Sequence, residues 1–267
     1  GISAPVLADL KVDWGNALIS DVSPDPLPDL FAGSQLVVLG RYTEGGAATI
    51  TLTGTVDGER RTYAFPNQIL PTARGDGWLP RLWATRRVCY LLNQIRLNGE
   101  SRELVDEIVR LSVRFGIVTS YTSYLLTEDD ILSAEGRTRV AQDVMTQAAQ
   151  PAPVSGAAAV DRAVAMNSMA SAESAAPIAA TIARADGVAI DADEVLRYAG
   201  GHAFILHDGV WTDTTFDPGT MTPEQIAFLS DAYFDLLERR PELGPALALG
   251  EQVILVADGV TYEITAN

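Results

Sequence analysis

Residues 79–127, LPRLWATRRVCYLLNQIRLNGESRELVDEIVRLSVRFGIVTSYTSYLLT, have the densest periodic hydrophobicity of the chain. Apolar residues recur three and four positions apart in two runs, which are Val88, Leu91, Leu92 and Ile95, and then Leu104, Ile108, Leu111 and Phe115. This spacing predicts two helices, each with one apolar face. Gly99 and Gly116 are placed to end the helices in a left-handed cap, and Ser101 is placed to cap the second helix.

The chain after Gly116 changes from helical to extended character. Residues 118–126 are rich in Thr, Tyr and Val, whose branched or aromatic side chains favour a strand. A further helix is expected over residues 128–149, with Asp129 and Asp130 in its first turn. Residues 76–145 are therefore predicted to be a helical region, built on a helical hairpin, with a strand near 118–126.

Residues 1–75 have the pattern of short antiparallel strands. The strand-like runs are 6–12, 35–42, 47–56 and 60–65. Asp57-Gly58 lies between the last two runs and favours a type I′ hairpin turn, because both central residues of that turn take positive φ. The prolines within residues 23–33 exclude a central strand there. This part of the chain is predicted to be a β-sandwich-like domain.

Residues 196–267 predict an α+β module made of β-hairpins plus one helix. Asp208-Gly209 and Asp258-Gly259 each separate two strand-like runs, as in the first hairpin. The helix is expected to begin at Pro223, after the cap Thr222, and to end before Pro241. The Ala- and Pro-rich residues 146–195 predict a linker or a small-residue helix. The fold class is therefore α+β.

Composition limits the function classes. The formal net charge of −16 and the pI near 4.4 argue against nucleic acid and anionic membranes as partners, because both require clustered Lys and Arg. Cys89 is the only cysteine, so an internal disulfide is excluded. The sequence has no signal peptide and no apolar run of about 18 residues, which argues against direct membrane insertion. Since the chain opens with Gly1 and not with methionine, we expect it to be a piece of a longer protein.

One catalytic hypothesis combines Cys89 as nucleophile, His202 or His207 as base, and Asp208 or Asp213 to orient the base. The helical apolar pattern around Cys89 favours instead a small buried hydrophobic residue. Strand alternation places the two histidines on opposite faces, so we expect one half-buried and one surface histidine. We therefore assign no catalytic residue and predict that the chain is not an enzyme.

Acidic residues raise the question of a metal site. Asp191, Asp193 and Glu194 resemble the start of a calcium loop, but the glycine and the closing glutamate of that loop are missing. Helix capping explains them equally well, and we assign no metal ligand. A second acidic set is equally ambiguous and consists of Asp208, Asp213 and Asp217.

No glycine-rich phosphate loop occurs, so no cofactor is expected. Trp83 and Trp211 are expected in the core.

Several motifs together resemble a known family. They are Asp21-Val22-Ser23-Pro24, LPDLFAGSQL at 27–36, Gly40-Arg41-Tyr42, Leu82-Trp83-Ala84, Leu111-Ser112 and GIVTSYTS at 116–123. This combination resembles the region after the von Willebrand factor A (VWA) domain in inter-α-trypsin inhibitor heavy chains. The match covers residues 1–127, and the chain after residue 195 is similar to the tails of bacterial members.

The resemblance implies a function without catalysis. In this family a VIT domain and a VWA domain come first, and ligand binding is attributed to the adhesion site of the VWA domain, whose DxSxS motif has no match here. The resemblance therefore implies a scaffold or interaction region of a secreted or cell-surface adhesion-type protein. Its expected partners are the upstream VWA and VIT domains of the same parent chain and a protein or extracellular-matrix ligand. The alternatives are a hydrolase that uses Cys89 or a carboxylate pair, and an independent calcium- or carbohydrate-binding module.

Overall fold

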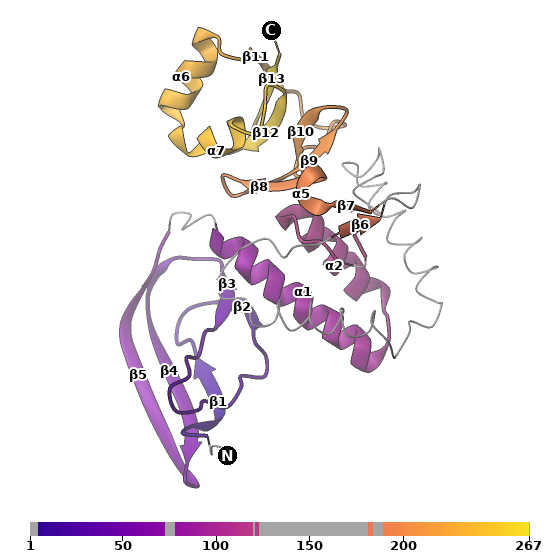
Figure 1. Cartoon of the computed structure of the whole chain (residues 1–267). Coiled ribbons are helices and arrows are strands. Elements are labelled where there is room, and N and C mark those ends of the chain that lie inside the picture. Colours follow the sequence, from indigo (N-terminus) through magenta and orange to yellow (C-terminus); the bar gives the residue numbers. More distant parts are fainter. Residues whose placement is uncertain (1–4, 73–77, 120, 123–180, 184–188, 267) are drawn as a thin grey trace. The chain divides into compact units, whose positions relative to one another are not determined.

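A computed structural model of the chain describes residues 5–72, 78–119, 121–122, 181–183 and 189–266 (Figure 1). The chain forms two compact units, Gly1–Leu79 and Pro80–Asn267, and the boundary falls in the first turn of helix α1 (Trp78–Asn98). Each unit has sheets of its own. This mixture of helices and sheets confirms the predicted α+β class.

The first unit is built on a three-stranded antiparallel sheet and a two-stranded ribbon. The sheet has the order β1-β4-β5, with bounds Ala8–Asp13, Gly46–Val56 and Glu59–Leu70. The ribbon pairs β2 (Ile19–Ser23) with β3 (Leu39–Tyr42). The strand predicted over 47–56 is confirmed, whereas the run 35–42 is a strand only from Leu39 onward.

The hairpin between β4 and β5 turns at Asp57-Gly58, as predicted. The φ angles of these two residues are 50° and 83°, so both are positive, as a type I′ turn requires. The described residues of this unit form one sheet and one ribbon, and the β-sandwich-like arrangement therefore remains a prediction.

The predicted helical hairpin is confirmed by α1 and α2 (Arg102–Phe115). Ser101 caps α2 by accepting a hydrogen bond from the Leu104 N–H at 3.4 Å. Gly116 ends α2 with φ 62°, the left-handed conformation that glycine adopts without strain. Arg87 of α1 and Glu107 of α2 form an ion pair of 2.9 Å that joins the two helices.

The strand predicted near 118–126 is corrected for its described residues. Thr119 and Thr122 lie in a turn, in which the Thr119 N–H donates to the Thr122 Oγ1 at 2.9 Å. The Thr122 N–H donates to the Thr119 carbonyl at 3.1 Å. Side-chain hydroxyls of threonine compete for backbone groups in this way, and here they replace strand pairing. Residues 123–126 lie outside the described residues.

The second unit has a six-stranded mixed sheet with the order β11-β13-β12-β10-β9-β8. The bounds from β8 to β13 are Leu196–Ala199, His202–His207, Val210–Asp213, Glu224–Ala227, Val253–Ala257 and Val260–Thr265. The predicted hairpins at Asp208-Gly209 and Asp258-Gly259 are confirmed, and all four of these residues have positive φ. Two parallel pairs, β10 with β12 and β11 with β13, connect the hairpins into one sheet.

Helices cover both faces of this sheet. One face packs against α6 (Asp231–Arg239), the 3-10 turn η2 (Pro241–Leu243) and α7 (Gly244–Leu247). The core on this face includes Phe204, Trp211, Tyr233, Leu236, Leu247, Val253, Leu255 and Ile264. The opposite face meets the end of α2, where a Cβ on Gly116 would lie 3.3 Å from the Ala203 Cβ. This close approach is a second reason for a glycine at position 116.

The helix predicted to begin at Pro223 begins eight residues later, at Asp231. Glu224–Ala227 instead forms β11, which pairs in parallel with β13 and buries Ile226 in the sheet. Ser230, and not Thr222, is the N-cap. The capping-box pattern was therefore overridden by tertiary strand pairing. The predicted end before Pro241 is confirmed, since α6 stops at Arg239.

The predicted linker over 146–195 is described only at its end. There β6 (Thr181–Ala183) pairs with β7 (Ala189–Asp191), and the short helix α5 (Ala192–Val195) follows. The helix expected over 128–149 lies outside the described residues. The predicted domain limits at 75, 145 and 195 stay predictions.

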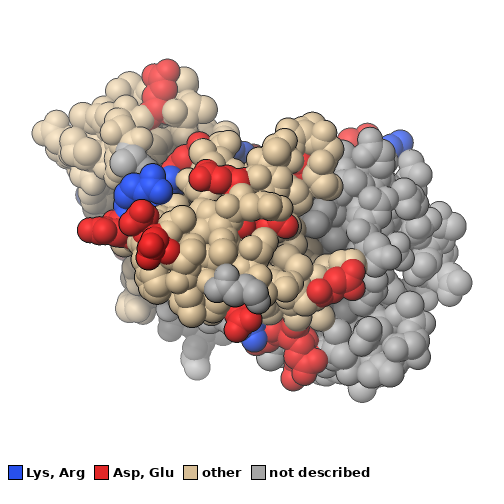
Figure 2. All heavy atoms as spheres, turned by 90° about the horizontal axis from the view of Figure 1, so that it is seen from above, with Lys and Arg blue, Asp and Glu red and all other residues tan. Residues whose placement is uncertain are grey.

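The surface reflects the acidic composition. Figure 2 shows a face on which Asp and Glu side chains are scattered among uncharged residues and Lys or Arg side chains are few. The sequence has 35 acidic residues against 19 basic ones.

Candidate functional site

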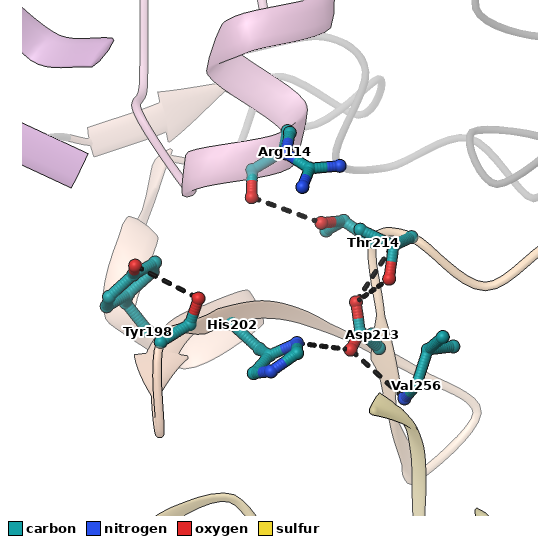
Figure 3. A network of polar contacts seen from close by, with 8 residues as sticks. Arg114, Tyr198, His202, Asp213, Thr214 and Val256 are labelled. Carbon is teal, nitrogen blue, oxygen red and sulfur yellow. Dashed lines mark hydrogen bonds and ion pairs between the residues drawn. The ribbon is translucent and has the colours of Figure 1, made fainter. Parts of the chain in front are cut away.

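The six-stranded sheet brings His202 and Asp213 together. Asp213 at the end of β10 is opposite Phe204 of β9, and His202 lies two residues before Phe204 on the same face of the strand. The His202 Nδ1 is 2.9 Å from the Asp213 Oδ2 (Figure 3). The expectation of one half-buried and one surface histidine is confirmed, because His202 is half-buried and His207 is exposed.

The Asp213 carboxylate is 0% exposed and accepts hydrogen bonds on both oxygens. Its Oδ1 accepts from the Thr215 N–H at 2.8 Å and from the Thr215 Oγ1 at 2.7 Å. Its Oδ2 accepts from the Val256 N–H of β12 at 3.2 Å, in addition to His202. A buried charge is stable only when it is paired and hydrogen-bonded, and these four contacts meet that requirement.

The position of Asp213 explains what the carboxylate does for the fold. Parallel pairing between β10 and β12 covers Trp211–Val253 and Thr212–Ile254. Directly after these pairs, the Asp213 carboxylate accepts from the Val256 N–H, two residues beyond Ile254 on β12. The side chain therefore continues the connection between the two strands and also holds His202 of β9. We interpret the His202–Asp213 pair as a structural link between three strands.

The catalytic hypothesis for Cys89 is not supported by its surroundings. Cys89 is buried on α1, and its Sγ accepts a hydrogen bond from the Asn93 Nδ2 at 3.9 Å. Burial raises the pKa of the Cys89 thiol, which lowers the fraction of the reactive thiolate at neutral pH. The structure thus describes the small buried hydrophobic residue that the helical pattern indicates.

We expect the Cys89 thiol to react with iodoacetamide at least about a hundredfold more slowly in the folded chain than in urea. The rate should remain low between pH 7 and pH 8.5, because the raised pKa keeps the thiol protonated over this range. Mass spectrometry of quenched samples measures this rate. Rapid labelling of the folded chain at neutral pH would restore the nucleophile hypothesis.

The acidic candidates lie in exposed local structures. Asp191 is at the N-cap position of the short helix α5, with Asp193 and Glu194 in its first turn, but the Asp191 side chain makes no capping hydrogen bond. Asp217 closes a turn, in which it accepts from the Gly219 N–H and the Thr220 Oγ1, both at 2.9 Å. Asp208 lies in its hairpin turn, 3.4 Å from His207. Among the described residues, no group of three or more His, Cys, Asp or Glu side chains is placed to hold a metal ion.

One polar cluster was not found by sequence analysis. The Arg81 guanidinium of α1 lies 4.8 Å from the centre of the Tyr198 ring, and its Nη2 donates to the Gly116 carbonyl at 3.0 Å. Burial lowers the pKa of Arg81, while Tyr198 and Asp193 oppose this shift. The Thr214 Oγ1 also donates to the Arg114 carbonyl at 3.5 Å (Figure 3). The Arg81–Tyr198 and Arg114–Thr214 contacts attach the helical hairpin to the sheet. Both join residues about a hundred or more positions apart, so no local pattern predicts them.

The tryptophans expected in the core, Trp83 and Trp211, are buried, which confirms that prediction. The described helices include none that is long and apolar enough to cross a membrane.

Comparison with known proteins relates the chain to two groups. It is 26% identical over 144 residues to the inter-alpha-trypsin inhibitor heavy chain H3 of Mus musculus, which covers 48% of this chain and 16% of that protein. The human heavy chain H4 is 23% identical over 141 residues, covering 48% of this chain and 15% of that protein. A von Willebrand factor A domain-containing protein of Dictyostelium discoideum is 24% identical over 128 residues. This match covers 46% of this chain and 14% of that protein.

These homologues confirm the coarse resemblance, at low identity over about half of the chain. The chain spans only about a sixth of the length of the heavy chains that it matches. No protein-family model and no solved structure matches it. The relatives are named as inhibitor heavy chains and as VWA-containing proteins, and these names do not denote enzymes.

Proposed function

We propose that this chain is a non-catalytic scaffold and interaction region of a secreted or cell-surface adhesion-type protein. In this proposal it follows a VWA domain in a longer, bacterial parent chain and supports that domain. The VWA and VIT domains of the parent are its nearest partners, and a protein or extracellular-matrix ligand is a further one. Similarity to heavy chains and VWA proteins supports the proposal, and one structural observation carries it.

That observation is an apolar face on the three-stranded sheet of the first unit. Leu52 of β4 lies opposite Val12 of β1 and Tyr63 of β5, and Ile50 lies opposite Phe65. Opposite residues of a sheet share a face, so these five apolar side chains form one surface. We call it the apolar sheet face. The other face is mostly polar and includes Lys11, Asp13, Thr51, Thr53, Thr62 and Ala64.

The apolar sheet face is open to solvent on its β5 side. Tyr63 is 45% exposed and Phe65 is 47% exposed, while Val12, Ile50 and Leu52 are only half-buried. In stable β domains an apolar sheet face packs against a second layer about 10 Å away. Exposed aromatic side chains at alternate positions of one strand are therefore typical of a docking surface. A neighbouring domain of the parent chain supplies the second layer in our proposal.

Hydroxyl-radical footprinting of this chain alone and of the full-length natural polypeptide tests the proposal. We expect Tyr63 and Phe65 to be oxidised readily in the isolated chain and several-fold more slowly in the full-length polypeptide. Leu97, which is 69% exposed on α1 of the second unit, is the internal control and should react similarly in both. Equal oxidation of Tyr63 and Phe65 in both samples, or a full-length polypeptide without a VWA domain, would contradict the proposal.

Substitution of Phe65 by serine should have different effects in the two proteins. In the isolated chain we expect the free energy of unfolding to fall by less than about 1 kcal/mol, because half of the ring is already in water. In the full-length polypeptide we expect a loss of about 2 kcal/mol or more, because the ring would be buried there. Urea denaturation measures both values. Ala64→Ser, on the opposite face of the same strand, is the matched control and should have a small effect in both.

A further inference from the structure

We propose that the second unit binds a basic, apolar segment of a partner protein at the outer side of α6. The site consists of Leu229 and Phe234, together with three acidic residues of the same helix, Asp231, Asp235 and Glu238. We call this set the α6 patch. It lies at the free end of the six-stranded sheet, because β11, which leads into α6, is the last strand in the order (Figure 1).

The start of α6 puts the two apolar residues at the positions of a hydrophobic staple. Ser230 is the N-cap, and its hydroxyl accepts from the Tyr233 N–H at 3.3 Å. Leu229 directly precedes the cap and Phe234 follows it by four residues, which are the positions that pack in a hydrophobic staple. Both side chains remain open to solvent, since Leu229 is 56% exposed and Phe234 is 52% exposed.

A structural role accounts for this pair only in part, because the Phe234 ring packs edge-on against the Tyr233 ring with the centroids 5.6 Å apart, yet half of Phe234 stays exposed. The first turn of α6 is already anchored by the Phe228 ring, which packs edge-on against the Tyr233 ring with the centroids 5.3 Å apart. Tyr233 in turn is part of the core beneath the helix. Leu229 also has φ 57°, a left-handed conformation that is strained for a residue with a Cβ. Leu229 is strained and half-exposed, although the Phe228–Tyr233 contact already joins the start of α6 to the core. We take this combination to favour contact with a partner.

The charges around the pair define the chemistry of that partner. Asp231, Asp235 and Glu238 are exposed on α6, and none of them forms an ion pair with the described residues. Arg239 is close by, but its Nε donates to the backbone carbonyl of Asp235 at 3.2 Å. An apolar pair with an acidic rim is complementary to apolar side chains that are flanked by Lys or Arg. The same rim, on a chain of net charge −16, disfavours a second copy of this chain as the occupant.

Fluorescence anisotropy with a labelled peptide of alternating lysine and leucine tests the site. We expect this peptide to bind the intact chain, and binding to weaken as salt screens the acidic rim. Peptides of alternating lysine and serine, or of alternating glutamate and leucine, should bind at least about tenfold more weakly. If the lysine–serine peptide binds equally well, or if the lysine–leucine peptide does not bind, the proposal is wrong.

The Phe234→Ser variant localises the binding. We expect it to weaken the lysine–leucine peptide about tenfold or more, as the loss of an aromatic anchor does. Val260→Ser removes a similarly exposed apolar side chain from β13 and is the matched control, with unchanged binding expected. Equal effects of the two substitutions would overturn the site. A dimer that becomes a monomer only in Phe234→Ser would assign the patch to a second copy and would also overturn it.

The Leu229→Gly variant separates partner binding from a structural role. Glycine accepts positive φ without strain, so we expect its melting temperature to equal that of the natural sequence or to rise by ~2–4 °C. Peptide binding should nevertheless fall, because the apolar anchor is lost. A lowered melting temperature with unchanged peptide binding would show that Leu229 only stabilises the start of α6 and does not bind a partner.

Discussion

Replacement of Asp213 by asparagine is expected to lower the free energy of unfolding of the second unit by about 3 kcal/mol. The carboxylate accepts two hydrogen bonds on each oxygen, from Thr215 on one side and from His202 and Val256 on the other. An asparagine amide has one oxygen and one NH2 group. In either orientation the NH2 group faces a partly buried backbone N–H, that of Thr215 or that of Val256. At least one donor therefore loses its acceptor and is repelled.

Asp208→Asn is the matched control for this prediction. Asp208 is on the same hairpin, also lies beside a histidine, and is exposed at 90% of its side chain. Asparagine keeps the positive φ that this turn requires, so we expect a change within about 0.5 kcal/mol. Urea denaturation followed by circular dichroism measures both variants. Equal stability of Asp213→Asn and the natural sequence would show that the carboxylate does not connect the three strands.

The second large effect is expected for Phe204→Ala, with a loss of about 3–5 kcal/mol. Phe204 is a fully buried side chain on β9 and lies in the core beneath α6 and α7. Its truncation removes apolar area from the core and leaves a cavity that the neighbouring strands fill only in part.

Hydrogen exchange measured by mass spectrometry shows where this loss occurs. Because the two units have separate sheets, we expect faster exchange in the strands of the second unit and little change in β4 and β5. Phe234→Ala removes the same ring from an exposed position, and we expect it to cost less than about 1 kcal/mol. Similar losses for the two alanine variants would contradict the core that the structure describes.

Local sequence signals predicted much of the fold because their physics is local. Both helices of the hairpin follow from apolar spacing, from the cap at Ser101 and from Gly116. The Asp-Gly turns were predicted for the same reason, since positive φ at two successive residues is required by the turn itself. The prediction of a buried Cys89 also rests on a local pattern, and the structure confirms that this thiol is buried.

The errors occurred where strand pairing competed with a local signal. Thr222, Pro223 and Gln225 satisfy the rules for a helix start, yet the adjacent residues gain more by pairing with β13 and burying Ile226. Thr119 and Thr122 have strand-forming side chains, yet their hydroxyls and backbone groups bind each other in a turn. In both places the outcome depends on partners that lie elsewhere in the fold or on side-chain hydrogen bonds that periodicity does not reveal.

The sequence by itself determined the α+β class, the helical hairpin, the turns and the acidic character of this protein. Only the tertiary structure decided that Asp213 holds three strands together, that Tyr63 and Phe65 share an open apolar face, and that Leu229 is strained beside Phe234. The physical reason is the range of the interactions. Caps, turns and apolar periods act within a few residues, whereas strand order, burial and the pairing of buried charges arise only when distant segments meet.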